Sequence, residues 1–200
     1  MSIKVLIERR VSDFIKQYPE FSTEKINKQF LFFSIFNLFK DSKITYDEIL
    51  DGVVDDTDDY GIDGVYIFSS GQLVDEEEDL NPQISKEDTI KIQFLQVSRD
   101  LGFSETALLK FRNAIEQIFD LEKDIKGNKN FNRKVELIRN VWIYCFDLGN
   151  IKGIEIELIY ISLSDTERIE RKIQNIESDI YKYLKKQELK RVKIKYIGMP

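Results

Sequence analysis

The alternation of strand-like and helix-like segments constrains the fold of this chain more than any other feature of its sequence. Residues 154–161 read Ile-Glu-Ile-Glu-Leu-Ile-Tyr-Ile and predict a strand, and residues 166–186 place isoleucines and a leucine on one helical face. Residues 192–196 alternate apolar and charged side chains and predict a closing strand. Strand, helix and strand in succession are typical of proteins that combine a sheet with covering helices.

The first part of the chain supplies the other elements. Residues 132–146 fill two faces with apolar side chains, so the pattern fits a helix or a strand, and its length favours a helix. We expect further helices at 23–40, 46–50 and 103–119, and strands at 62–68 and 90–98. The order helix, strand, strand, helix, helix, strand, helix, strand predicts an α/β fold with a mixed central sheet flanked by helices.

Composition restricts the chemistry. The 200 residues are 42% apolar and 33% charged, which predicts one compact domain with its own core. Histidine is absent, which excludes catalytic histidine systems and histidine-bound zinc or copper. The single cysteine, Cys145, excludes an internal disulfide and a multi-cysteine zinc site, and favours a reducing, cytoplasmic compartment. Carboxylate, lysine, arginine and hydroxyl chemistry remains.

No segment predicts export or insertion into a membrane. The N-terminus lacks a basic stretch followed by a long apolar run. The most apolar stretch, residues 30–39, is about half the length of a membrane span and contains Ser34 and Asn37.

Charge is unevenly distributed along the chain. The net charge is −6, but residues 51–79 contain eleven acidic residues and no Lys or Arg, which leaves +5 on the remaining residues (−6 + 11 = +5). Residues 182–195 hold seven basic side chains and one acid, Glu188. Such a pattern fits a basic surface that contacts phosphates around an acidic metal site. For the tail alone, residues 182–195, a solvated helix that ends in a charged strand is the favoured interpretation.

Six aspartates lie between Asp51 and Asp63. Because crowded carboxylates repel one another, they are kept in water or around a cation. A calcium loop of the EF-hand type is excluded: counted from Asp56, the fifth and twelfth positions are Tyr60 and Ile67, and a count from Asp59 fails in the same way.

Polar side chains are expected to meet where two strands adjoin. In a strand at 90–98 the side chains of Phe94, Gln96 and Ser98 share one face, and Asp63 opens the preceding strand. Active sites often collect where strand ends splay apart, so we expect Asp63, Gln96 and Ser98 at one sheet edge. Exposure of a strand end to water is the alternative explanation.

Three short motifs in this region resemble a known family. Residues 61–67 (GIDGVYI), 94–98 (FLQVS) and 102–107 (GFSETA) resemble the N-terminal nuclease-like region of abortive-infection phage-resistance proteins of the AIPR type. More distantly, they resemble Mrr-type restriction endonucleases of the PD-(D/E)XK superfamily. The resemblance extends over about residues 30–198 and implies a restriction-endonuclease-like fold. It implies that residues 1–200 form a single nuclease-like domain, and because a further domain follows in the resembling proteins, it leaves open that the chain is an N-terminal fragment.

The resemblance also implies roles for individual residues. Asp63 matches the metal-binding aspartate, with Asp59 as a supporting metal ligand. Gln96 matches the acidic position of the second motif, and Ser98 occupies the position of the catalytic lysine. Serine cannot supply a cation there. In this chemistry Mg²⁺ or Mn²⁺ activates water and stabilises charge on the phosphate, while the lysine helps to place the nucleophile.

Substitutes for the missing lysine, and a third carboxylate, remain open from sequence alone. Lys91 and Arg99 point to the opposite face of the predicted strand, whereas Lys110 on the following helix could swing toward the site. The resembling superfamily often takes a third carboxylate from its first core helix. The candidates for this ligand are Glu24, Glu48 and Asp51.

Two functions follow as expectations from the resemblance. The first is a metal-dependent DNA endonuclease-like domain in phage defence, by abortive infection or restriction. The alternative, favoured by the serine at position 98, is an inactive nuclease-fold module that binds nucleic acid or a partner protein. A homodimer is left open. Phe103, Phe111 and Trp142 are predicted to be core residues rather than surfaces for base stacking.

Overall fold

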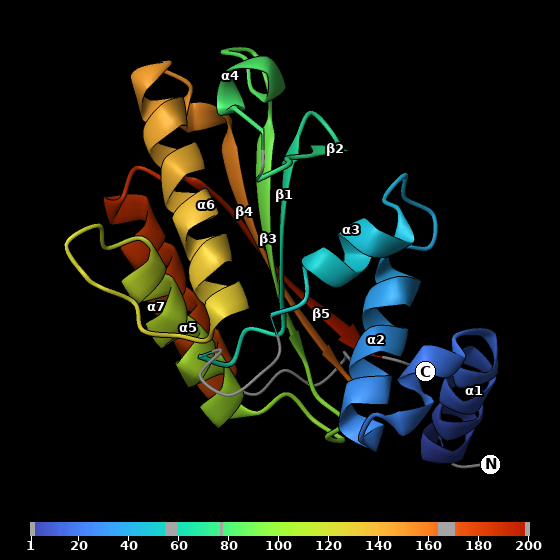
Figure 1. Cartoon of the computed structure of the whole chain (residues 1–200). Helices are drawn as coiled ribbons and strands as arrows, with labels where there is room; N and C mark the ends of the chain where they lie inside the picture. Colours follow the sequence, from blue (N-terminus) through green and yellow to red (C-terminus); the bar gives the residue numbers. More distant parts are fainter. Residues whose placement is uncertain (1–2, 55–59, 77, 164–170, 199–200) are drawn as a thin grey trace.

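The computed structural model describes residues 3–54, 60–76, 78–163 and 171–198 and has one mixed five-stranded sheet with helices on both faces (Figure 1). The strands lie in the order β2-β1-β3-β4-β5. Their bounds are Gly64–Ser69 for β1, Gln72–Leu73 for β2, Ile90–Val97 for β3, Ile154–Ser162 for β4 and Arg191–Gly198 for β5. Strand β1 is antiparallel to β2 and β3, whereas β3, β4 and β5 run parallel. The expected α/β fold with a mixed sheet is confirmed.

The helices occur close to the positions that periodicity predicts. They are α1 (Ile3–Gln17), α2 (Ile26–Phe39), α3 (Tyr46–Asp51), α4 (Leu80–Gln83), α5 (Glu105–Ile118), α6 (Lys129–Asp147) and α7 (Arg171–Lys186). The ambiguous segment 132–146 is helical, as its length suggested. Helices α1 and α4 were not predicted. No helix within the described ranges is long and apolar enough to cross a bilayer.

The parallel pairs determine which helices cover which face. Parallel strands need a crossover connection, and α5 and α6 connect β3 to β4 while α7 connects β4 to β5. These three helices lie on one side of the sheet, and α1, α2 and α3 lie on the other (Figure 1). The larger core lies under the crossover helices and includes Ile92, Phe94, Leu158, Phe111 and Ile180, all buried. Phe111 is therefore a core residue, as predicted.

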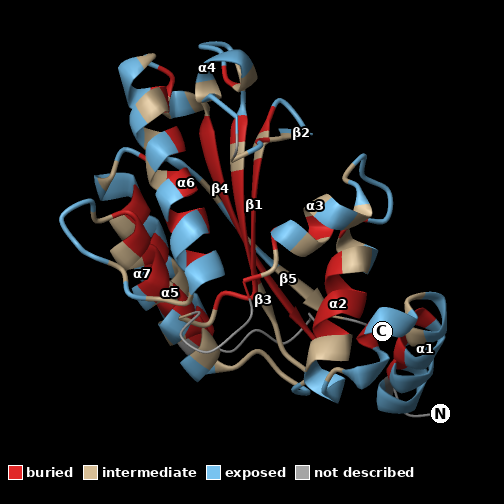
Figure 2. Ribbon diagram, in the orientation of Figure 1, coloured by how far each residue is buried: buried red, intermediate tan, exposed pale blue. Residues whose placement is uncertain are grey.

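Strand β4 lies between β3 and β5, and every one of its residues is buried, including two glutamates (Figure 2). Glu155 lies 3.0 Å from the Nζ of Lys193 and 3.7 Å from Arg191, and Glu157 pairs with Lys195. These three basic residues belong to β5 and to the basic tail. Part of the positive charge of residues 182–195 therefore neutralises buried carboxylates and is not available to a phosphate.

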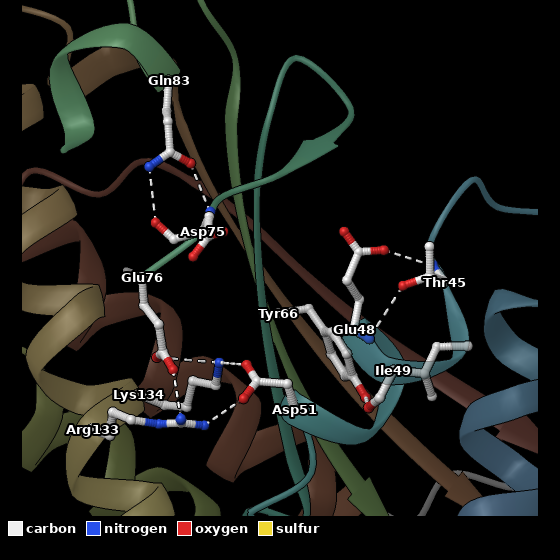
Figure 3. Close-up of polar contacts among 10 residues, drawn as sticks. All are labelled: Thr45, Glu48, Ile49, Asp51, Tyr66, Asp75, Glu76, Gln83, Arg133 and Lys134. Carbon is white, nitrogen blue, oxygen red and sulfur yellow. Dashed lines mark hydrogen bonds and ion pairs between the residues drawn. The ribbon is translucent and has the colours of Figure 1, made fainter. Parts of the chain in front are cut away.

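A network of four charged side chains joins α3, α6 and the loop after β2 (Figure 3). Arg133 of α6 reaches Asp51 at 2.6 Å and Glu76 at 2.7 Å, and the neighbouring Lys134 pairs with the same two carboxylates. The side chain of Lys134 is only 8% exposed. Glu76 lies in an acidic stretch of the loop, but its side chain is only 14% exposed and is held by these two cations.

Removal of the buried cation should destabilise the fold more than removal of an exposed one. We expect Lys134→Ala to lower the free energy of unfolding by about 1–2 kcal/mol, less than for a fully buried pair because Asp51 remains partly exposed. Lys16→Ala removes the exposed pair with Asp13 and should change the free energy of unfolding far less. Urea denaturation measures both, and equal losses would contradict the structural role of Lys134.

The same network predicts a dependence on pH. Burial acts to raise the pKa of Asp51, but hydrogen bonds and charge from Lys134 and Arg133 outweigh it and hold the pKa below its ordinary value of 3.8. A lowered folded-state pKa gives stability that is present above the unfolded pKa and lost as the pH falls. The difference in unfolding free energy between wild type and Lys134→Ala should therefore shrink below about pH 4. A difference that stays constant from pH 7 to pH 3 would contradict this assignment.

Candidate functional site

The candidate site lies at the edge where β3 and β4 end and β1 begins, at the lower edge of the sheet in Figure 1. Asp63 directly precedes β1, and its backbone is fixed on both sides. Its N–H donates to the carbonyl of Leu95 at 2.8 Å, and its carbonyl accepts from the N–H of Val54 at 3.0 Å. The antiparallel pairing of β1 with β3 therefore places Asp63 beside the end of β3.

The carboxylate of Asp63 contacts the end of β3 directly. Its Oδ2 accepts a hydrogen bond from the backbone N–H of Val97 at 2.5 Å and another from the side-chain Nε2 of Gln96 at 3.0 Å. Asp63 is 8% exposed, so this carboxylate is held at a defined position. The structure thus brings together Asp63 and Gln96, as strand periodicity predicted.

Gln96, Gly61 and Lys110 converge beside this contact. Gly61 has a φ of +78°, and a methyl group at this position would lie 3.3 Å from the Oε1 of Gln96 and 3.2 Å from the Cβ of Lys110. Glycine thus allows the loop before Asp63 to lie against the first turns of α5. The Oε1 of Gln96 is buried and accepts no hydrogen bond from any residue that the structure describes.

Ser98 does not join Asp63 and Gln96. Its N–H continues the ladder to the carbonyl of Ile161 at 2.9 Å, but its hydroxyl donates to the Oδ2 of Asp100 at 2.8 Å and accepts from the Asp100 N–H at 3.2 Å. This is a local turn in which a serine hydroxyl bonds the backbone two residues later. Ser98 thus brings a second carboxylate, that of Asp100, to the edge of the site.

Tyr160 of β4 completes the wall of the site. It pairs in register with Gln96, and its buried hydroxyl accepts from the N–H of Ser104 at 3.1 Å. Its pKa is raised, chiefly by burial and further by the charges of Asp100 and Asp63, although hydrogen bonds with Ser104 and Ser98 oppose the shift. Tyr160 is therefore a neutral phenol at ordinary pH and offers a hydrogen-bond donor.

Two of the possible third carboxylates have other roles (Figure 3). Glu48 closes a capping box at the start of α3, where it accepts from the N–H of Thr45 at 2.6 Å. Asp51 pairs with Arg133 and Lys134. Both of these candidate carboxylates are therefore engaged in structural contacts. For Glu24, the structure gives only a backbone role, since its N–H closes the turn to Phe21.

The other candidate residues named from the sequence are Asp59, Lys91 and Arg99. Asp59 lies outside the described residues. Lys91 projects from the opposite face of β3, and Arg99 is directed away toward α1 and α2, where it bonds Asn27 at 3.1 Å and lies 3.6 Å from Glu8. Both positions confirm the prediction that these two side chains point away from the face that bears Gln96. In the part of the chain that the structure describes, no three acidic or cysteine side chains are grouped to hold a metal ion.

The sequence indicated two of the residues at this edge and missed two others. Asp63 and Gln96 could be found from the period of the strands. Asp100 and Tyr160 were missed, because Asp100 reaches the site through a turn and Tyr160 through the register between two strands that are about sixty residues apart. A serine two positions before an aspartate at a strand end is the signal that could have identified Asp100.

Comparison of the chain with protein-family models, curated proteins and solved structures found no match.

The contribution of the Asp63 hydrogen bonds to stability can be measured separately from the contribution of its negative charge. Asp63→Ala removes the acceptor of the Val97 N–H and the Gln96 amide, so we expect it to lower the free energy of unfolding by about 1–3 kcal/mol. Asp63→Asn keeps an oxygen for Val97 and should cost about 1 kcal/mol or less. Urea denaturation of both variants tests this, and an asparagine variant as unstable as the alanine variant would contradict it.

Proposed function

We propose that this chain is a restriction-endonuclease-like domain of the PD-(D/E)XK type that cleaves DNA in phage defence, by abortive infection or restriction. The contact between Asp63 and Gln96 is the observation that supports the proposal most directly. The strand arrangement is also compatible with it: β1 is antiparallel to β3, and a helical crossover leads to the parallel strand β4. The sequence motifs that resemble AIPR-type and Mrr-type proteins lie on these elements.

The residues present fit a site for Mg²⁺ or Mn²⁺ with few protein ligands. Mg²⁺ commonly keeps several waters and is held by one or two carboxylates together with phosphate oxygens. Asp63 offers a carboxylate, and the buried Oε1 of Gln96 lacks a donor within the described chain. When bound, the ion would lower the pKa of a water and stabilise charge on the phosphate. Because the Nε2 of Gln96 now faces Asp63, joint binding of an ion requires the amide to turn over.

Lys110 is our candidate for the missing cation. Its side-chain stem lies against Gly61, next to the Oε1 of Gln96, and the residue is exposed and thus able to reach a phosphate at this edge. Ser98 cannot take this role, since its hydroxyl is engaged with Asp100. In the proposed mechanism Asp63 and Gln96 hold the ion, Lys110 neutralises phosphate charge, and the Tyr160 phenol donates a hydrogen bond at the wall.

The second candidate function is a non-catalytic module of the same fold that binds nucleic acid or a partner protein. The Ser98–Asp100 pair favours it, because it places negative rather than positive charge beside the lysine position. In both cases we propose a cytoplasmic protein, and DNA is the partner that the first function requires. A homodimer and an additional C-terminal domain are compatible with either function.

Plasmid cleavage in the presence of Mg²⁺ or Mn²⁺ tests the enzyme proposal. We expect metal-dependent nicking or linearisation that is lost in Asp63→Asn, which keeps the Val97 contact. Lys110→Met should lower the rate about 100-fold or more, as loss of one electrostatic stabiliser does elsewhere. Lys86→Met is the matched control, because Lys86 is an exposed lysine that precedes the opposite end of β3, and it should leave the rate unchanged.

The outcomes separate the two functions. Absence of cleavage together with salt-dependent DNA binding would contradict the enzyme and support the binding module. Cleavage that persists in Asp63→Asn would contradict the assignment of the site.

A further inference from the structure

A second hollow lies on the face of the sheet opposite Gln96. It has a volume of about 480 Å³ and opens between the end of α2, the turn from β1 to β2 and the middle of β3, β4 and β5. Helix α2 packs on the same face through Leu31, Ile35 and Phe39 but leaves this part of it uncovered. The hollow is of the size that small-molecule sites commonly have, and it is separated from the candidate catalytic edge by the sheet itself.

The walls of the hollow are apolar and its floor is polar. Phe39 and Phe68 form an aromatic wall with ring centroids 6.3 Å apart, and Ile159 continues it. Gln93 of β3 and Glu157 of β4 are paired in register on the floor. Apolar walls with a few fixed polar groups are the usual construction of a small-molecule site.

Gln93 presents an acceptor that has no donor. It is 9% exposed, and its Nε2 donates to Glu157, which fixes the orientation of the amide. Its Oε1 is buried and accepts no hydrogen bond from the residues within the described ranges. Most buried polar atoms of proteins are hydrogen-bonded, so such an acceptor indicates a position that a donor from outside the chain completes.

The charge of the hollow favours an anion. Lys195 pairs with Glu157, which is 1% exposed, so these two charges largely neutralise each other. Lys91 also lines the hollow and influences Glu157 electrostatically, but it forms no ion pair with a residue in the described part of the chain. One positive charge therefore remains beside the aromatic wall.

We propose that this hollow binds a small ring compound that bears an N–H or O–H donor and one anionic group. The ring packs between Phe39, Phe68 and Ile159, the anion lies at Lys91, and a shift of the Gln93 side chain opens its buried Oε1 to the donor. The proposal does not depend on nuclease activity, because all of its residues lie on the other face of the sheet.

Three related compounds test, on the intact chain, whether the hollow prefers a ligand that has the ring, the donor and the anion. Indole-3-acetate has the ring, the donor and the anion, 1-methylindole-3-acetate lacks the donor, and indole lacks the anion. In titrations followed by ¹⁵N-resolved NMR, indole-3-acetate should shift the side-chain amide of Gln93 and the backbone of neighbouring β3 residues. We expect it to bind about fivefold more tightly than either relative, the effect of one hydrogen bond or one exposed charge.

Two variants test whether Gln93 and Lys91 cause these differences in affinity between the probes. Gln93→Met keeps the volume and should abolish the difference between indole-3-acetate and its methylated relative. Lys91→Met should abolish the difference between indole-3-acetate and indole. Lys129→Met, an exposed lysine at the start of α6, should change neither difference.

Titration of the wild-type protein alone is enough to overturn the proposal. Absence of shifts at millimolar indole-3-acetate, or equal affinity for all three probes, would overturn it whether or not Gln93→Met folds. Discrimination that survives in Lys91→Met would overturn the assignment of the anion position.

Discussion

Strands β3 and β4 pair in parallel, and this pairing determines where the helices cross the sheet and where the polar side chains meet. Parallel neighbours cannot be joined by a tight turn, so α5 and α6 must cross one face of the sheet, where they bury the larger core. The same pairing places the carboxyl ends of both strands at one edge. Tyr160 and Gln96 then lie side by side, and the antiparallel strand β1 brings Asp63 to the same position.

The two faces of the sheet have different chemistry because strand residues alternate. On β3, Phe94 and Gln96 face the crossover helices, whereas Lys91 and Gln93 face α2. On β4 the second face bears Glu155 and Glu157, which are buried and matched by the basic residues of β5. The basic tail thus stabilises the sheet as well as charging its surface, and the sheet separates two polar sites from each other.

Periodicity predicted most elements of the fold, because a buried helix face and an alternating strand leave clear patterns. Helix α1 was missed, although it contributes Ile7, Val11 and Phe14 to a small core with α2. It packs on α2, the next helix along the chain, and the exposed apolar residues Val5 and Leu6 blur the pattern of its buried face in the sequence. The burial of Glu157 could not be predicted either, since alternation alone suggests an exposed acidic face and the matching lysine lies on another strand.

The candidate site was predictable only in part. Asp63 and Gln96 follow from strand geometry, whereas the turn of the Ser98 hydroxyl toward Asp100 depends on how the chain leaves β3. The position of Lys110 beside Gly61 depends on the packing of α5 against a glycine turn. Both of these contacts involve a turn or loop, and the local backbone conformation there is not fixed by the hydrophobic pattern.

We propose that Asp63 and Gln96 together bind a divalent cation. Paramagnetic broadening by Mn²⁺ in ¹⁵N-resolved NMR spectra measures this binding without a requirement for turnover. We expect broadening confined to the amides around Gly61, Asp63 and Val97, with reversal by excess Mg²⁺ and loss in Asp63→Asn. Broadening that is absent at these amides, or that is unchanged in Asp63→Asn, would show that these two residues do not hold the ion.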